Sequence, residues 1–437
     1  MARTERSRVR LLLILMLFVL SAIAFLDRTN ISVAGVRMRV DYGLAPVTLG
    51  WIFSAFLIGY AAFQVPAGWL AGRFGPRRVL TVAILWWGLF TALTAMVPAQ
   101  ARHPVLLLIL VRLALGAGES VVYPAGNQFL ARWIPASERG KANGWIFAGV
   151  GAGAGLTPPI ITAIIAAGGW RASFYVCALV GIAAGLVWFV VARDRPEDHP
   201  AVNAAELAHI RAGLPPLPDD HGPVPWRAIL SSGNVWALFW SYFAFGYVIW
   251  LFFSWFFIYL ADARHLDLKS SAMYGMVPFF AMTLCCLAGG VINDRLSKAR
   301  GLYWGRCLLA VLSFLLTATF LAIGSLAAST GLAVAILAGG AGAIYLSQSS
   351  FWSVTADIAG HHSGVVSGFM NMGCQIGGAL TSSLTPWIAE KFGWTAAFVV
   401  GAAIVLVGVA AWAVVDPNRL LEPEETAPAA PTAAVPV

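Results

Sequence analysis

Residues 11–26 read LLLILMLFVLSAIAFL, and the next two residues are Asp27 and Arg28. An unbroken run of this kind is typical of a helix that crosses a bilayer, whose hydrocarbon core needs roughly 20 apolar residues. Charged side chains at the centre of such a helix cost about 2.5–3.5 kcal/mol each on insertion scales. The stretch therefore predicts a membrane helix whose charged end faces protein or water rather than lipid.

The whole chain has the same character. Of its 437 residues, 59% are hydrophobic and 11% are charged, and the mean hydropathy is +0.78. These values indicate an integral membrane protein. The apolar windows lie at 11–36, 47–70, 79–97, 105–130, 142–167, 172–191, 234–260, 272–292, 303–325, 331–356, 365–389 and 395–415. The predicted fold class is all-α, with twelve transmembrane helices in two pseudo-repeats of six helices.

One polar interruption divides these windows. Residues 193–233 include RDRPEDHP and GLPPLPDDHGPVP, a charged and proline-rich composition that is typical of a cytoplasmic linker. We expect an N-terminal six-helix bundle at 1–192, this linker at 193–233, and a C-terminal bundle at 234–415. Within the linker, NAAELAHIRAG predicts a short surface helix capped by Asn203. The low-complexity tail, 416–437, is expected to be disordered.

The two halves share short matches in the same order. GGWRASF at 168–174 corresponds to FGWTAAF at 392–398, and RGKANG at 139–144 falls on SGVVSG at 363–368, both at an offset of 224. GWLAGR at 68–73 falls on GVINDR at offset 222. Three ordered matches indicate an internal repeat. Folds built from two such repeats bind their ligands at the interface between them, near the middle of the membrane.

The basic residues indicate how the chain is oriented. Of the 28 Lys and Arg residues, 19 lie on the side of the N-terminus and linker, seven on the opposite side, and two, Arg28 and Arg112, deep inside windows. This is the positive-inside pattern, so both termini are predicted to be cytoplasmic in a multi-pass protein of a bacterial-type inner membrane. Anionic lipid accounts for the short basic clusters, and nucleic acid is not an expected partner. Read instead as a secretory signal, the N-terminus would leave eleven helices and an impaired charge asymmetry.

The sequence contains few features that would indicate an enzyme or a metal-binding protein. The five cysteines fall within windows, are odd in number and show no metal or redox spacing. There is no HExxH, GxSxG or phosphate-loop motif. GVGAGAG at 149–155 lies inside a window and is better explained by close helix packing. We predict no enzyme activity, no metal site and no cofactor.

Four charged residues lie well inside windows: Asp27, Arg28, Arg112 and Glu119. At about 1.5 Å per residue, Asp27 lies about 24 Å along its helix, at a depth that allows a pair with Arg112. Arg112 and Glu119 are about 10.5 Å apart along a straight helix and cannot touch. The four residues are either a salt-bridge network or the charged lining of a water-filled cavity. Because buried pairs are weak evidence for stability, we favour the cavity, where arginine forks bind carboxylates and a desolvated acid carries a proton.

Four motifs carry a family resemblance: FLDRTNISVA at 25–34, GWLAGRFGPRRV at 68–79, RLALGAGESVVYP at 112–124 and ERGKANG at 138–144. They resemble signatures of the major facilitator superfamily, specifically its anion:cation symporter family. The resemblance extends from about residue 10 to 416. The loop motif after the second window marks the superfamily, and the combination of DR with RxxxGxGE is more specific.

The resemblance implies roles for individual residues. Asp27 and Glu119 would be the protonating acids, Arg112 the partner of Asp27, and Arg28 the group that meets a substrate carboxylate. Tyr60 matches a binding tyrosine. Further substrate-binding candidates in the second half are Trp352, Ser353, Thr355, Asn371 and Gln375. Serine and threonine hydroxyls in membrane helices, however, often bond only to the backbone or a neighbouring helix. The loop motif and its repeat suggest gating by Arg73, Arg77, Asp294 and Arg295.

The sequence departs from the family pattern at two positions. Gly72 replaces the usual aspartate of the loop motif, which weakens the expected charge latch. Phe25 stands where sugar-acid transporters carry a tyrosine, so one hydroxyl contact is missing. The window 234–260 is also unusually aromatic, and its rings either line the cavity or lie in the interfacial belt: Tyr247, Trp250, Trp255 and Tyr259. These features favour a less hydroxylated or aromatic carboxylate.

The resemblance implies a secondary active transporter. We expect proton-coupled uptake of a small organic anion, such as a sugar acid or an aromatic carboxylate, by alternating access. The coupling ion would be H⁺. The protein would be embedded in the lipid bilayer and would be a monomer. Two alternatives remain open, a proton-driven efflux antiporter and a transporter-like nutrient sensor. Two arginines among the buried charges favour anions over lipophilic cations.

Overall fold

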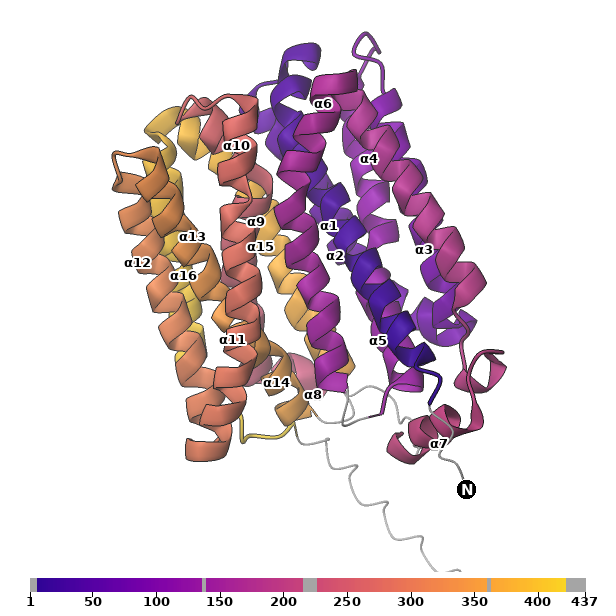
Figure 1. Ribbon diagram of the computed structural model, residues 1–437. Helices are drawn as coiled ribbons and strands as arrows, with labels where there is room; N and C mark the ends of the chain where they lie inside the picture. Colours follow the sequence, from indigo (N-terminus) through magenta and orange to yellow (C-terminus); the bar gives the residue numbers. More distant parts are fainter. Residues whose placement is uncertain (1–5, 136–138, 215–225, 360–362, 422–437) are drawn as a thin grey trace, which may run out of the picture.

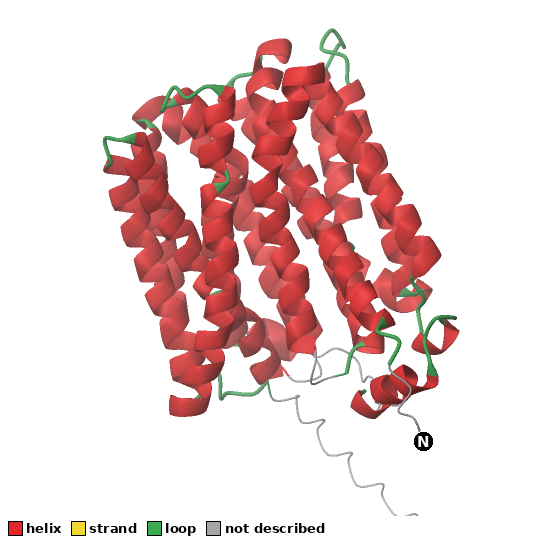
Figure 2. Cartoon of the chain, viewed as in Figure 1, coloured by secondary structure: helices red, strands yellow, loops and turns green. Residues whose placement is uncertain are grey.

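The computed structural model describes residues 6–135, 139–214, 226–359 and 363–421, and all regular structure in these ranges is helical (Figures 1 and 2). The N-terminal half contains α1 Val9–Tyr42, α2 Pro46–Phe74, α3 Pro76–Met96, α4 Pro104–Glu119, α5 Val122–Trp133 and α6 Arg139–Val191. Between the halves lie α7 Ala204–Gly213 and α8 Trp226–Ser231. The C-terminal half contains α9 Gly233–Asp262, α10 Leu268–Gly275, α11 Val277–Arg300, α12 Leu309–Leu326, α13 Thr330–Leu346, α14 Gln348–Ala359, α15 Ser363–Phe392 and α16 Trp394–Ala413.

These helices make twelve passes through the bundle. Ten stretches of the described chain are long and apolar enough to cross a membrane. One of them, Gly144–Val191, makes two passes because α6 turns sharply at Gly169. The remaining pass is α15, which is 30 residues long but more polar. The predicted all-α fold class is therefore confirmed. Three predicted windows are each made of two helices, α4 with α5, α10 with α11, and α13 with α14.

The internal repeat is visible in the backbone. Gly169 has φ 78° and ψ 171°, and Gly393, which lies 224 residues later, has φ 85° and ψ 163°. Both turns join the fifth pass of a half to the sixth, and a residue with a β-carbon would be strained in this conformation. The repeat found at this offset in the sequence thus corresponds to the same turn made twice.

The two halves lie side by side, with α1–α6 on one side and α9–α16 on the other (Figure 1). The interface between them is formed mainly by α1 with α9, α2 with α15, and α6 with α10 and α11. Within the N-terminal half, α1 and α6 pack very closely. A β-carbon on Gly149 would lie 2.4 Å from the Phe18 carbonyl oxygen, and one on Gly153 would lie 2.2 Å from that of Ala22. The glycine-rich stretch is confirmed as a helix-packing element.

Helix α9 is enclosed by protein around most of its surface. Its aromatic side chains, including Phe245, Trp250 and Trp255, are buried. A helix that is apolar on every face is expected at the centre of a large assembly. Its unusual aromatic content is therefore explained by packing on all sides as well as by the cavity described below.

A buried carboxylate joins α7 to the start of α1, on the side of the N-terminus and α7, here called the linker side. The predicted surface helix is confirmed as α7, with Asn203 accepting a hydrogen bond from the Glu206 N–H at 2.9 Å. The Glu206 carboxylate in turn accepts hydrogen bonds from Ser7 Oγ, the Val9 and Arg10 N–H groups, and Arg10 Nη1. Burial alone would raise the pKa of Glu206, but these hydrogen bonds outweigh it and lower the pKa. The helix is thereby fixed to the start of α1.

Part of the C-terminal tail is also anchored. Asn234 Nδ2 donates to the Asp416 carbonyl oxygen at 2.8 Å, and the Leu421 N–H donates to that of Ile358 at 2.8 Å. Residues 416–421 are thus ordered against α9 and α14, in contrast to the disorder expected from residue 416 onward, because they satisfy backbone groups at helix ends. The rest of the expected tail, 422–437, lies outside the described residues, as do 215–225 of the linker.

Candidate functional site

A cavity of about 690 Å³, counting the space that opens to solvent, lies between the two halves. Aromatic rings make up much of its wall, interrupted by one guanidinium, three amides and two thiols. Its lining residues are Phe25, Arg28, Tyr60, Tyr123, Phe147, Val150, Tyr242, Phe245, Ile249, Trp250, Phe253, Cys286, Tyr345, Gln348, Trp352, Asn371, Cys374 and Gln375. Both halves contribute to it, at the place where two-repeat transporters bind their ligands.

Two interrupted helices border this cavity. Helix α4 ends at Glu119 and α5 begins at Val122, while α13 ends at Leu346 and α14 begins at Gln348. The interruptions are at equivalent positions in the two halves. Broken helices within a membrane protein occur where the backbone borders a protein-lined or water-filled cavity. The predicted windows 105–130 and 331–356 gave no sign of these breaks.

The charged centre of the site is an ion pair between α1 and α4. Arg28 Nε donates to Glu119 Oε1 at 2.6 Å, and the side chains are only 3% and 1% exposed. The sequence argument found no basic partner for Glu119 on its own helix, and α1 supplies one. Arg28 also lies against aromatic rings, at 4.6 Å from the ring centre of Phe25, 4.8 Å from Tyr60 and 5.6 Å from Phe56. A guanidinium is suited to this setting because it is weakly hydrated and stacks on rings.

The expected pair between Asp27 and Arg112 is not formed. Asp27 Oδ2 accepts a hydrogen bond from Thr91 Oγ1 at 2.5 Å. The Arg112 guanidinium lies 4.9 Å from the centre of the Phe56 ring, and its Nε has no hydrogen-bond partner among the described residues. The hydroxyl of α3 reaches the carboxylate and the ring accommodates the guanidinium, so a direct contact is not made. Asp27, Arg112 and Glu119 are buried behind the cavity wall, and only Arg28 of the four charged residues lines the cavity.

Three buried polar atoms of the cavity wall lack a hydrogen-bond partner within the described chain: Arg28 Nη2, Trp352 Nε1 and Gln375 Oε1. Buried polar groups are nearly always paired, and each unpaired one costs about 1–3 kcal/mol. The three belong to α1, α14 and α15, so they surround one space from both halves. Such an arrangement indicates a polar ligand.

The other expected substrate-binding residues divide into two groups. Tyr60 and Asn371 line the cavity, as do Trp352 and Gln375. Ser353 and Thr355 do not. The Thr355 hydroxyl donates to the Trp352 carbonyl oxygen at 2.9 Å, which is a local contact of the kind common in membrane helices.

Some of the aromatic residues of α9 line the cavity and others do not. Trp250 lines the cavity, and so does Phe253, which the sequence argument did not select. Tyr247, Trp255 and Tyr259 are buried elsewhere; the Trp255 Nε1–H, for example, donates to the Ser382 carbonyl oxygen at 3.1 Å. Their positions on other faces of α9 explain the difference.

Sequence reasoning also missed two amides. Gln348 begins α14, lines the cavity and donates through Nε2 to the Tyr242 hydroxyl at 3.1 Å. Gln64 lies on α2, and its Oε1 accepts from Asn371 Nδ2 at 3.1 Å. Both amides sit inside otherwise apolar windows, and this is the signal that would have identified them.

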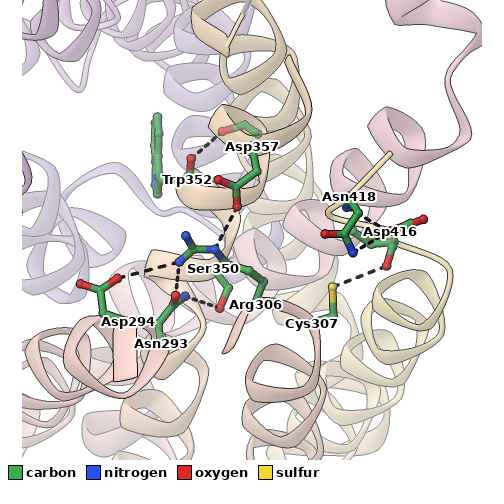
Figure 3. Close-up of polar contacts among 11 residues, drawn as sticks. Asn293, Asp294, Arg306, Cys307, Ser350, Trp352, Asp357, Asp416 and Asn418 are labelled. Carbon is green, nitrogen blue, oxygen red and sulfur yellow. Dashed lines mark hydrogen bonds and ion pairs between the residues drawn. The ribbon is translucent and has the colours of Figure 1, made fainter. Parts of the chain in front are cut away.

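Of the expected gating residues, Asp294 belongs to a polar cluster on the linker side of the C-terminal half (Figure 3). Arg306 is its centre: Nε contacts Asp357 at 3.0 Å, and Nη1 contacts Asn293 and, at 4.0 Å, Asp294. Asn293 Nδ2 also donates to Ser350 Oγ at 3.1 Å. The cluster ties α11 and the short π-helix Trp304–Leu308, which directly precedes α12, to α14. Arg306 and Asp357 were not selected from the sequence.

Among the remaining gating candidates, Arg77 contacts its own half. Arg77 donates to the Phe189 carbonyl oxygen through Nε at 3.0 Å and Nη2 at 2.5 Å, and its backbone N–H donates to Asp194 Oδ1. Arg73 lies 5.7 Å from the Phe74 ring and is exposed, as is Arg295. The N-terminal loop motif, which has Gly72 in place of aspartate, thus uses Asp194 at its turn.

Contacts between the halves are concentrated on the side opposite the linker. Arg39 Nη1 contacts Asp262 Oδ2 at 2.5 Å, and Ser32 Oγ donates to the Ser254 carbonyl oxygen at 2.8 Å, both between α1 and α9. Between α2 and α15, Ser54 Oγ donates to the Ala379 carbonyl oxygen at 2.6 Å. These contacts hold the two halves together on this side of the cavity.

Comparison with known proteins agrees with this architecture. The family model described as the Major Facilitator Superfamily matches residues 17–382. The chain belongs to the major facilitator superfamily. It is therefore a membrane transporter rather than an enzyme, and the anion:cation symporter resemblance seen in its motifs is supported by its relatives.

Two curated relatives resemble the chain over nearly its full length. The probable sulfoacetate transporter SauU of Cupriavidus necator is 32% identical over 97% of this chain and 98% of its own. The hexuronate transporter of Bacillus subtilis is 27% identical over 99% of both chains. Among solved structures, a bacterial homologue of the human lysosomal transporter Spinster, inward-facing and occupied, matches with a TM-score of 0.75 at 16% identity, over 93% of this chain and 97% of its own. The last similarity concerns the fold.

Proposed function

We propose that this protein is a proton-coupled symporter that takes up a small organic anion by alternating access. Its linker side would face the cytoplasm, in a bacterial-type inner membrane. It would work as a monomer without a cofactor, and the coupling ion would be H⁺. Two relatives are named as a probable sulfoacetate transporter and a hexuronate transporter, and both named compounds contain a carboxylate, which supports this choice of substrate class.

One observation carries the proposal: Arg28 presents an unpaired Nη2 to a cavity that also contains an unpaired indole N–H from Trp352 and an unpaired amide oxygen from Gln375. A carboxylate or sulfonate on Arg28 would complete the guanidinium's hydrogen bonds, since arginine binds such groups through two parallel N–H bonds. A second polar group on the same small molecule would reach the other two atoms. Lipophilic cations would instead meet the positive charge of Arg28.

Proton coupling would follow from the contact between Arg28 and Glu119. While Glu119 is ionised, it holds one edge of the guanidinium at 2.6 Å and neutralises its charge. Protonation of Glu119 removes that charge and leaves Arg28 available for the anion. Asp27, hydrogen-bonded to Thr91 behind the wall, would be the second protonating acid, and Arg112 would keep a positive charge near both.

The cavity wall favours a compact, lightly hydroxylated or aromatic anion. Most of the lining consists of rings, and Phe25 adds another where a hydroxyl would suit a sugar acid. Three amides, Gln348, Asn371 and Gln375, remain to read hydroxyl or carbonyl groups. The two clusters around the loop motifs would act as gates: Arg73 and Arg77 in one half, and Asp294 and Arg295 in the other.

The test is uptake by proteoliposomes from a panel of carboxylates and sulfonates under an imposed proton gradient. We expect accumulation of at least one small anion that stops when the gradient is collapsed. Accumulation that ignores both the gradient and external pH would refute proton coupling. Absence of binding by every anion, together with transport of a lipophilic cation, would refute the substrate class.

A further inference from the structure

One hydrogen bond between the halves lies beside the cavity, whereas the bonds between the halves described above lie on the side opposite the linker. Asn371 Nδ2 on α15 donates to Gln64 Oε1 on α2 at 3.1 Å. Asn371 lies about 12 Å into α15 from its linker-side end, whereas the pair of Ser54 and Ser383 joins the same two helices toward the opposite end. Gln64 is buried, at 6% exposed, and is not itself part of the cavity lining.

Gln64 is also linked to the charged centre. It lies one helical turn after Tyr60, and the Tyr60 hydroxyl lies beside the Gln64 amide and beside Arg28. The Arg28 guanidinium is 4.8 Å from the centre of the Tyr60 ring and is bonded to Glu119. A continuous series of contacts therefore leads from the carboxylate of α4 to the α15 amide that faces the cavity.

The hydrogen bond restricts what Asn371 can offer a ligand. An asparagine amide has two N–H donors and one carbonyl acceptor. Donating one N–H to Gln64 fixes the orientation of the amide, so that its remaining donor and its acceptor are presented from a defined position. Without Gln64 the side chain would be free to rotate, and ligand binding would have to order it again, at a cost in affinity.

We propose that Gln64 is a positioning residue for the anion site: it orients Asn371 across the interface between the halves, and it does so through contacts that begin at Arg28 and Glu119. The inference rests on the proposed function. Because the bond joins α2 of one half to α15 of the other, any movement that separates these two helices would break it. Recognition through Asn371 would then be strongest while α2 and α15 are in contact beside the cavity.

The test is a double-mutant cycle in proteoliposomes. Gln64→Met keeps the length of the side chain and removes the acceptor, and Asn371→Ala removes the donor. The matched control is Ser54→Ala, which removes a hydrogen bond between the same two helices away from the cavity. For the transported anion identified in the panel, counterflow gives KM and the maximal rate, and direct binding gives Kd.

We expect Gln64→Met to weaken anion binding by about three- to tenfold, the range that one lost neutral hydrogen bond produces, with little loss of maximal rate. In the Asn371→Ala background the same change should have no further effect on Kd, because its target is already absent. Ser54→Ala should leave Kd unchanged. Purely additive effects of Gln64→Met and Asn371→Ala, or an unchanged Kd in Gln64→Met, would overturn the inference.

These outcomes are separable from failure of the proposed function. If the wild-type protein binds and accumulates an anion, additivity refutes only the role of Gln64. If the wild-type protein binds no anion, the proposed function itself is wrong. An equal rise in Kd in Gln64→Met and Ser54→Ala would show that any weakening of the contact between α2 and α15 lowers the affinity. That result also contradicts a positioning role.

Discussion

Replacing Glu119 with glutamine removes the negative charge that Arg28 contacts at 2.6 Å and preserves the shape of the side chain. The variant resembles the protein with this acid permanently protonated. We expect it to bind the anion and to exchange it across the membrane, because Arg28 and the rest of the cavity remain. It should no longer accumulate the anion against a gradient, because the proposed coupling proton is lost.

The size of the effect on binding follows from the contact that is removed. A hydrogen bond to a charged group contributes about 1.5–3 kcal/mol, and about 1.4 kcal/mol corresponds to tenfold in affinity. If the ionised carboxylate competes with the anion for Arg28, Glu119→Gln should bind the anion about 10- to 100-fold more tightly than the wild type at alkaline pH. In the wild type, uptake of one proton per anion changes the affinity by up to about tenfold per pH unit. In the variant this dependence should be largely absent from about pH 6 to about pH 8.

Binding, counterflow and gradient-driven uptake are measured on the same preparations. The chain provides a matched control in Glu206, another buried glutamate paired with an arginine, Arg10, at 3.1 Å but far from the cavity. Glu206→Gln should reduce thermal stability and leave coupling intact. This comparison separates loss of a buried ion pair as such from loss of the pair at the site.

Two results would refute the reasoning. If Glu119→Gln still accumulates the anion with the wild-type dependence on pH, Glu119 is not the coupling acid. If binding, exchange and thermal stability are all lost together, the pair of Arg28 and Glu119 is a structural network, since removing one partner of a buried pair costs about 3–5 kcal/mol.

Further variants test other parts of the structure. Arg28→Lys should weaken anion binding at least tenfold with a small change in melting temperature, since a point charge cannot replace a planar fork; unchanged Kd would contradict this. Cys374 lines the cavity, so alkylation by a small anionic thiol reagent should block transport and be slowed by bound substrate, which mass spectrometry of the modified residue can follow. Arg39→Ala removes the pair with Asp262 at 2.5 Å and should increase labelling of the cavity from the side opposite the linker; labelling equal to wild type would show that the other contacts suffice to hold the halves together there. Because the native pKa of Glu206 is lowered, its stabilising effect is present above the ordinary glutamate range, about 4.3, and is lost as pH falls through the native value. Proteolysis of the linker at decreasing pH should therefore accelerate in that range in the wild type but not in Glu206→Ala.

The fold was largely determined by local features of the sequence. Apolar windows predict membrane helices because the bilayer leaves few other conformations open to such segments. The ordered matches at an offset of 224 predict the repeat, and the equivalent turns at Gly169 and Gly393 display it. Asn203 predicts a helix start because capping involves residues only three positions apart.

The candidate site was predictable in composition and less so in its contacts. A charged residue inside an apolar window is conspicuous in any sequence, so Asp27, Arg28, Arg112 and Glu119 could be selected as a group. Which of them meet depends on the rotation and tilt of α1 against α4. The packing of these helices places Glu119 beside Arg28 and Thr91 beside Asp27.

The sequence by itself determined that this protein is a twelve-helix membrane protein with buried charge in its first half. Hydropathy and caps are encoded over short distances, and the repeat is found by comparing short segments without any knowledge of how they pack. Only the tertiary structure decided the partners. Helices α4 and α13 end at Glu119 and Leu346 beside the cavity. Gln64 contacts Asn371, and Trp352 lines the same cavity as Arg28, although more than 300 positions separate the residues of each pair. Such contacts depend on how whole helices pack, and packing is set by the shapes of both surfaces at once rather than by either segment alone.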